Sequence, residues 1–211
     1  MARATRVDVC CGSAMLAALA LPMKCLVLVM VTAALTLPAV SQQTKPKQGT
    51  SGKNHTVILQ SEGGSFAIEG PKDWIADRKV GRRLGVCCVY YPKGSWDTGE
   101  TIMYPNIVTK GPGQTTLREL MDADLARFRK DNPGMSFVDG DIPFKGRTAK
   151  LRYFRGVNQG SSEAVAYIDE EKIIALVVLS SKTEKGLTEA LPLLLGVLET
   201  YTYGARAVGA N

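Results

Sequence analysis

The run IIALVVL, residues 173–179, is apolar at every position, and it decides the fold that we expect. Neighbouring side chains of a β-strand point to opposite faces of the sheet, so a strand of this composition is buried on both faces. The run LGVCCVYY, residues 84–91, has the same character. Because such strands need cover on both sides, the sequence predicts a central sheet between two other layers.

Two helices can supply this cover. Thr116 and Glu119 fit a capping box, and apolar residues follow at helical spacing up to Phe128. A second capping box at residues 181–184 opens a helix whose leucines recur at similar spacing up to Tyr201. Strands occur in runs between these helices, which disfavours a parallel α/β sheet. We therefore predict an α+β fold, an α/β/α sandwich with a central antiparallel sheet of about six strands and one main helix on each face.

The remaining strands are expected from alternating apolar residues between turn signals. They span residues 65–69, 101–110, 145–155 and 162–168, with 56–59 as a further short strand. Pro105 interrupts one of them. Because proline has no amide hydrogen to donate, this strand is expected at an edge of the sheet or beside a bulge.

An export signal precedes this domain. Residues 23–43 read MKCLVLVMVTAALTLPAVSQQ, with Lys24 before an apolar run and small residues after it, the order of a secretory signal peptide. We expect cleavage after Ser41, or after Ala39 as the near alternative. An uncleaved membrane anchor is a further interpretation, although the 16 residues 25–40 fall short of the roughly 20 that a bilayer requires. We expect translation to begin at Met23; the alternative is one long leader with two apolar blocks.

The chain therefore divides into four parts. Residues 1–41 are the leader, 42–63 a flexible basic tether, 64–204 the folded domain and 205–211 a frayed tail. This organisation predicts a protein that is exported to a periplasm or to the medium, and that meets a membrane only through an uncleaved leader.

Charge and cysteine content change once the leader is set aside. The formal charge of the full chain is +6, but from Thr56 onward there are 20 basic and 19 acidic residues. Nucleic-acid binding needs a concentrated basic face, so this class of function is excluded. The basic cluster that includes Lys150 and Arg152 is interpreted as solvated.

Only Cys87 and Cys88 of five cysteines follow the leader. Because neighbouring side chains on a strand point apart, these two are expected to be buried apolar residues rather than a disulfide or a metal site.

Several patterns resemble the Mog1/PsbP-like superfamily. They are residues 66–68 followed by 71–74, the strand at 87–91, the strands at 164–168 and 176–181, and the helix at 191–201. The resemblance implies an antiparallel sheet between helices. Members include a lumenal photosystem subunit and a Ran-GTPase partner, so it also implies an accessory or binding module. The chain is similar to uncharacterised exported bacterial members with a PKGSxW-type loop, and it has no motif for metal or GTPase contact.

Catalytic constellations are absent from the sequence pattern. The one histidine, His55, lies in the tether, which removes the usual base of Ser-His-Asp or Cys-His sites. Asp122 and Asp124 stand two apart on a helix, so they point in different directions and are interpreted as a solvated face. No phosphate loop, zinc cluster or calcium loop has the required spacing. We therefore expect no enzymatic activity and no cofactor.

The loop KGSWD, residues 93–97, is the predicted contact surface. Tryptophan in a polar, glycine-flanked loop often marks an interface, and Lys93, Trp96 and Asp97 are the candidate partner contacts. The alternative is that Trp96 packs back on the sheet beside Tyr91 and Tyr104.

We expect an exported, non-catalytic accessory domain that binds a protein or small-molecule partner in the envelope. The alternatives are a histidine-independent envelope hydrolase that uses carboxylates, and a membrane-anchored structural envelope protein.

Overall fold

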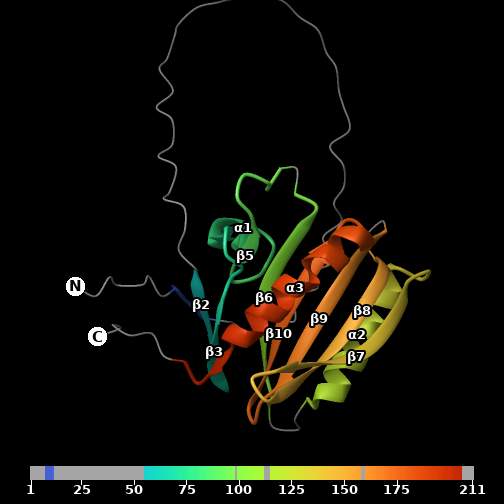
Figure 1. Ribbon diagram of the computed structural model, residues 1–211. Coiled ribbons are helices and arrows are strands. Elements are labelled where there is room, and N and C mark those ends of the chain that lie inside the picture. The colour runs from blue at the N-terminus through green and yellow to red at the C-terminus, as the bar shows by residue number, and fades with distance from the viewer. Residues whose placement is uncertain (1–7, 12–54, 98, 112–114, 158–159, 206–211) are drawn as a thin grey trace, which may run out of the picture.

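The computed structural model describes residues 8–11 by their backbone, and residues 55–97, 99–111, 115–157 and 160–205 in full (Figure 1). The predicted cleavage residues Ala39 and Ser41, the tether up to residue 54 and the tail from residue 206 lie outside the described residues. Export and processing therefore remain predictions from the sequence.

A seven-stranded sheet forms the centre of the domain, and all its neighbouring strands are antiparallel. In spatial order the strands are β4 (Trp74–Asp77), β5 (Val89–Pro92), β6 (Thr101–Thr109), β10 (Ile173–Ser181), β9 (Ser161–Asp169), β8 (Arg147–Val157) and β7 (Ser136–Phe144). Every residue from Ile173 to Leu179 is buried, so the prediction of a central strand covered on both faces is confirmed.

A second, smaller sheet was not predicted. Its strands are β1 (Asp8–Cys11), β2 (Thr56–Ser61), β3 (Gly64–Glu69) and β11 (Thr202–Tyr203), in this spatial order. β2 lies within the range predicted as tether, and β1, which pairs with it in parallel, lies within the predicted leader.

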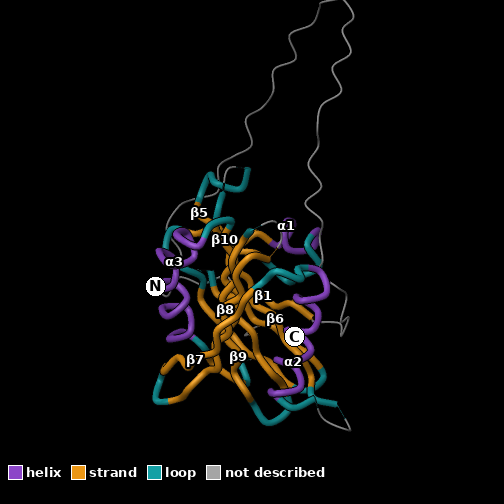
Figure 2. The backbone as a smooth tube through the Cα atoms, turned by 90° about the vertical axis from the view of Figure 1, so that its right-hand side faces the viewer, coloured by secondary structure: helices purple, strands orange, loops and turns teal. Residues whose placement is uncertain are grey.

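The two long helices lie on opposite faces of the seven-stranded sheet (Figures 1 and 2). α3 (Glu184–Thr200) packs on the face that carries Ala175 and Val177, and α2 (Leu117–Asp131) packs on the face that carries Leu176 and Val178. α1 (Arg78–Arg83) is a short third helix. The α+β class with mostly antiparallel sheets is confirmed. The finer prediction, about six strands with one main helix on each face, is not confirmed. The main sheet has a seventh strand, and a second sheet and α1 are also present.

Two expected strands differ in detail. Residues 84–91 do not form one strand: the amides of Leu84 and Val86 bond back to the carbonyl oxygen of Gly81, which closes α1, and only β5 follows as a strand. Pro105 lies on β6, which has a neighbour on each side. Its pairing with β5, however, is confined to Tyr90 and Met103, so Pro105 pairs only with β10. None of the described helices is both long enough and apolar enough to span a membrane.

Candidate functional site

The predicted contact loop lies between β5 and β6. Lys93 and Asp97 are exposed, whereas Trp96 is half-buried and packs on Tyr91 with ring centroids 5.1 Å apart. Trp96 also belongs to the cluster that includes Tyr104, as the packing alternative predicts. Contact of Lys93, Trp96 and Asp97 with a partner remains a prediction.

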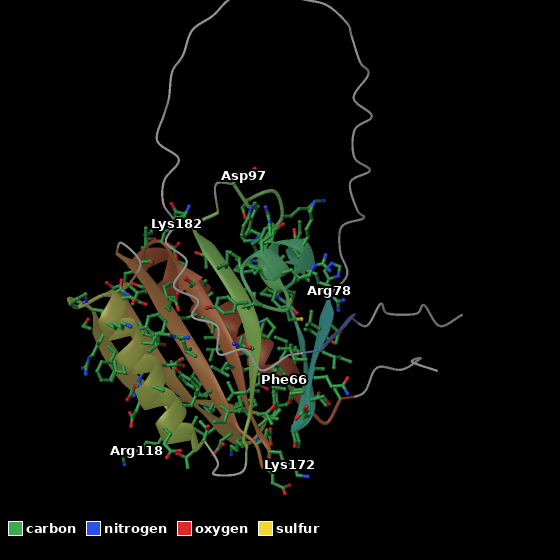
Figure 3. The ribbon with its side chains drawn as sticks, turned by 180° about the vertical axis from the view of Figure 1, so that it is seen from behind. Phe66, Arg78, Asp97, Arg118, Lys172 and Lys182 are labelled. Carbon is green, nitrogen blue, oxygen red and sulfur yellow. The ribbon has the colours of Figure 1, made fainter. Side chains whose placement is uncertain are left out.

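A groove with a volume of about 680 Å³ lies elsewhere, between α2 and the β7–β8 hairpin. It is lined by Leu117, Arg118, Met121 and Asp122 of α2, by Asp139, Gly140 and Asp141 of β7, and by Lys150 and Arg152 of β8. Figure 3 shows Arg118 and Asp97 at opposite ends of the molecule, so the groove and the predicted loop are separate surfaces.

The capping box fixes the start of α2 beside this groove. The Glu119 amide donates to Thr116 Oγ1 at 3.2 Å, and the Thr116 amide donates to Glu119 Oε2 at 2.8 Å. These two bonds satisfy amides that the first helical turn leaves unpaired. The hydrogen bonds from Thr116 also lower the pKa of Glu119. The capping box predicted from Thr116 and Glu119 is therefore present.

Arg152 anchors the groove. Its side chain is 5% exposed, and it donates from Nε to Asp139 Oδ1 at 2.6 Å and from Nη2 to Asp139 Oδ2 at 2.8 Å. Nη1 donates to the carbonyl oxygen of Met121 on α2, and the guanidinium lies 4.9 Å from the centre of the Phe137 ring. The interpretation of Arg152 as a solvated residue is wrong, because it joins β8, β7 and α2. Its hydrogen bonds lower the pKa of Asp139.

The other charges of the groove form exposed ion pairs. Lys150 Nζ lies 2.8 Å from Asp141 Oδ1, with side chains 51% and 56% exposed. Arg118 and Asp122 approach to 3.8 Å and are 91% and 62% exposed. Exposed pairs of this kind contribute at most about 1 kcal/mol, so either member can exchange its partner at little cost. A rigid, buried arginine thus stands beside charges that are available to a ligand.

A buried acid, Glu163, lies on the same face of the sheet. It is 6% exposed on β9 and accepts a hydrogen bond from Ser180 Oγ at 3.2 Å. Burial raises the pKa of Glu163 to about 7, because an ionised carboxylate loses its hydration there. Burial and the nearby charge of Glu163 also raise the pKa of Tyr104.

Asp124 reaches the same region from α2. Its side chain is only 12% exposed, accepts a hydrogen bond from Tyr167 at 3.0 Å and pairs with Arg127 at 2.9 Å. Burial raises the pKa of Asp124, although Arg127 opposes the effect. The interpretation of Asp124 as solvated is therefore wrong, whereas Asp122 is exposed as expected.

The two cysteines differ in state. Cys88 is a buried thiol, as expected. Cys87 is disulfide-bonded, so the expectation that neither cysteine forms a disulfide is wrong for Cys87. Within the described part of the chain, no group of three His, Cys, Asp or Glu residues is placed to hold a metal ion.

No family model matches the sequence, and no curated protein matches it. Among solved structures, cyanobacterial PsbP (CyanoP) from Synechocystis sp. PCC 6803 is similar, with 14% identity and a TM-score of 0.46 over 75% of this chain and 98% of that chain. A protein of unknown function from Pseudomonas aeruginosa, PA94, is also similar, with 14% identity and a TM-score of 0.36 over 77% of this chain and 90% of that chain. At this identity and overlap neither structure assigns a family or a function. Membership of the Mog1/PsbP-like superfamily therefore remains a prediction.

Proposed function

We propose that the chain is an exported accessory domain without catalytic activity, and that it binds a protein partner through the groove between α2 and the β7–β8 hairpin. The observation that supports this proposal is the contrast between the charges that line the groove. Arg152 is buried and held by Asp139, whereas Lys150 and Asp141 are about half-exposed and exchangeable. A buried, fixed charge beside exposed charges that can exchange partners suits the binding of a polar protein surface. Complementary charge on such a surface speeds encounter and gives specificity.

Export supports an extracytoplasmic partner. The signal in residues 23–41 has the charged start, apolar run and small-residue end of a secretory peptide. We place the protein in a periplasm or in the medium, with the leader removed.

Recovery of partners with charge-reversed variants tests the proposal. The tagged chain is expressed in its source, crosslinked in the exported fraction, and its partners are quantified by mass spectrometry. Asp141→Lys is expected to lower recovery of the partner at least tenfold, because it sets a positive charge beside Lys150 in the groove. Glu189→Lys is the matched control, since Glu189 is 65% exposed on α3, on the opposite face of the sheet. Equal recovery with both variants would refute the groove as the binding site.

A histidine-independent hydrolase is the second candidate, and the two carboxylates with raised pKa favour it. Glu163 is a suitable proton donor near neutral pH, and Asp124 is the second carboxylate of the region. Hydrolysis of envelope polysaccharides by the purified protein, abolished by Glu163→Gln, would support this candidate over the accessory domain.

A further inference from the structure

β7 is the last strand of the seven-stranded sheet, so no described strand pairs with its outer edge. It is nine residues long, and its pairing with β8 continues from Ser136 to Phe144 without a register shift. Exposed edges in natural proteins are commonly kept short, bulged or covered, or carry charged side chains and proline, because their unpaired amides and carbonyls attract other strands. β7 carries two aspartates and Pro143, but its length and regularity leave an edge beside the groove that a strand of complementary charge can join.

The turn between β7 and β8 determines which backbone groups face outward. Phe144 pairs with Arg147 across the two residues Lys145 and Gly146, whose φ values are +44° and +70°. This is the two-residue hairpin turn with both central residues at positive φ, and its flanking pair is hydrogen-bonded. Hydrogen-bonded and non-hydrogen-bonded pairs then alternate along antiparallel strands.

The amides and carbonyls that face away from β8 consequently belong to alternate residues, counted back from the turn. They are those of Pro143, Asp141, Asp139 and Phe137. Pro143 has no amide hydrogen. Three outward N–H groups and four outward carbonyls remain in register along the edge.

The side chains on this edge add charge to the backbone pattern. Asp139 and Asp141 are two residues apart, so their side chains share one face of β7, and they are 48% and 56% exposed in the groove. Both oxygens of Asp139 are held by the buried Arg152, whereas Asp141 has an exposed pair with Lys150. We infer that β7 binds an extended, basic polypeptide segment, which adds to the sheet as an eighth strand and sets a basic side chain against Asp141. This inference rests on the proposed function and adds the binding mode and the chemistry of the partner.

A second copy of this chain is a poor occupant of the same edge. Antiparallel pairing of β7 with itself, centred anywhere from residue 139 to residue 141, sets Asp139 or Asp141 directly opposite a carboxylate of the other copy. Like charges directly opposite each other destabilise a strand pair. A segment with lysine or arginine at every second residue instead sets positive charges opposite the aspartates of β7, which is favourable.

A synthetic peptide tests the inference on the purified protein without an identified partner. The probe is the acetylated, amidated peptide TKTKTKT, and the control is TETETET, which has the same β-forming threonines and the opposite charge. Binding is measured by fluorescence anisotropy, and amide hydrogen exchange is measured by NMR. We expect saturable binding of the basic peptide alone. We also expect new protection of the amides of Phe137, Asp139 and Asp141, whereas those of Val138, Gly140 and Ile142 are already protected by β8.

Three variants separate backbone pairing from charge. Asp141→Pro removes an outward amide and should weaken binding at least tenfold, whereas Asp141→Asn keeps the amide and should weaken it about threefold. Pro143→Ala restores a fourth outward amide and should tighten binding. Thermal unfolding is measured for each variant to check that it is folded.

Absence of saturable binding, or equal binding by the variants Asp141→Pro and Pro143→Ala, would overturn the inference. New exchange protection elsewhere than on the outward amides of β7 would overturn it as well. If the strand-addition test fails while Asp141→Lys still loses the recovered partner, the proposed function stands with a different binding mode. If Asp141→Lys has no effect in that recovery, the proposed function itself fails.

Discussion

At the scale of single residues, Glu163 is a buried carboxyl group whose ionised form is destabilised by the loss of its hydration. It lies on β9 between Ser162 and Ala164, with Ser180 as its hydrogen-bond donor, and Arg127 provides only partial compensation for its charge. A carboxyl group in such a place remains protonated to higher pH than it does in water. Its protonation therefore couples the stability of the domain to pH.

Glu163→Gln should change this pH dependence. The pKa of Glu163 is about 7 in the folded protein against an ordinary value of 4.5. Between these values the folded state keeps a proton that the unfolded state releases, so the stability of the wild type falls as pH rises from 4.5 to 7 and is level above. Glutamine resembles the protonated acid, so the variant should match the wild type at pH 4.5 and exceed it by roughly 3 kcal/mol at pH 8.

Denaturant unfolding at pH 4.5 and pH 8 measures this difference. Glu171→Gln, at an exposed glutamate, is the matched control and should show no such change. A Glu163→Gln variant whose stability relative to the wild type is the same at both pH values would show that Glu163 is not buried as described.

Trp96→Ala tests the predicted contact loop. Loss of the ring contact with Tyr91 and of the half-buried surface should lower the free energy of unfolding by about 1–2 kcal/mol. Lys93→Ala and Asp97→Ala, at exposed positions, should leave it within about 0.5 kcal/mol. If Trp96→Ala changes neither the stability nor the recovered partners, both interpretations of this loop are wrong.

The sequence indicated some of these environments and not others. Trp96 packs beside Tyr91, as one of its two interpretations predicted. Glu163 was missed, although it adjoins the apolar residues 164–168, and an acid at the end of such a run is a usable signal of burial. Arg152 gave no such signal. Its burial depends on Asp139 and on the Met121 carbonyl, which lie on other elements and meet it only in the folded chain.

At the scale of elements, the capping box of α2 is the feature that local sequence specifies most directly. Thr116→Ala removes the Oγ1 acceptor of the Glu119 amide and should lower the free energy of unfolding by about 1 kcal/mol. Thr116→Ser keeps the acceptor and should remain within a few tenths of 1 kcal/mol of the wild type. Thermal and denaturant unfolding of both variants checks the prediction. Equal losses in the two would contradict a capping role for the hydroxyl.

Strongly periodic elements were predictable, and polar ones were not. β10 and the two long helices carry apolar patterns that local sequence displays. β7, SFVDGDIPF, has a glycine, a proline and two aspartates, and its pairing partner β8 supplies the regularity that the strand itself lacks. α1 is a short helix of six residues, mostly basic, and Asp77 caps its N-terminus. Its C-terminal cap, Leu84, lies in the run 84–91 that was predicted as a strand, so the helix was not recognised.

At the scale of the whole molecule, processing of the leader can be tested directly. We expect the mass of the exported protein to correspond to a chain that begins at Gln42, or at Val40 if cleavage follows Ala39. Ser41→Arg combined with Ala39→Arg should prevent cleavage, because the peptidase site requires small side chains. An exported wild-type chain that retains residues 23–41 would favour the membrane-anchored alternative.

The central claim is that the groove and edge beside β7 bind another polypeptide. Photo-crosslinking in the exported fraction tests it most directly, with a photoreactive residue in place of Asp141, and in a matched chain in place of Lys185 on the opposite face. We expect a discrete crosslinked product with a second polypeptide from position 141 and none from position 185. A product from position 185 alone, or no product with a polypeptide from position 141, would show that this surface is not the binding site.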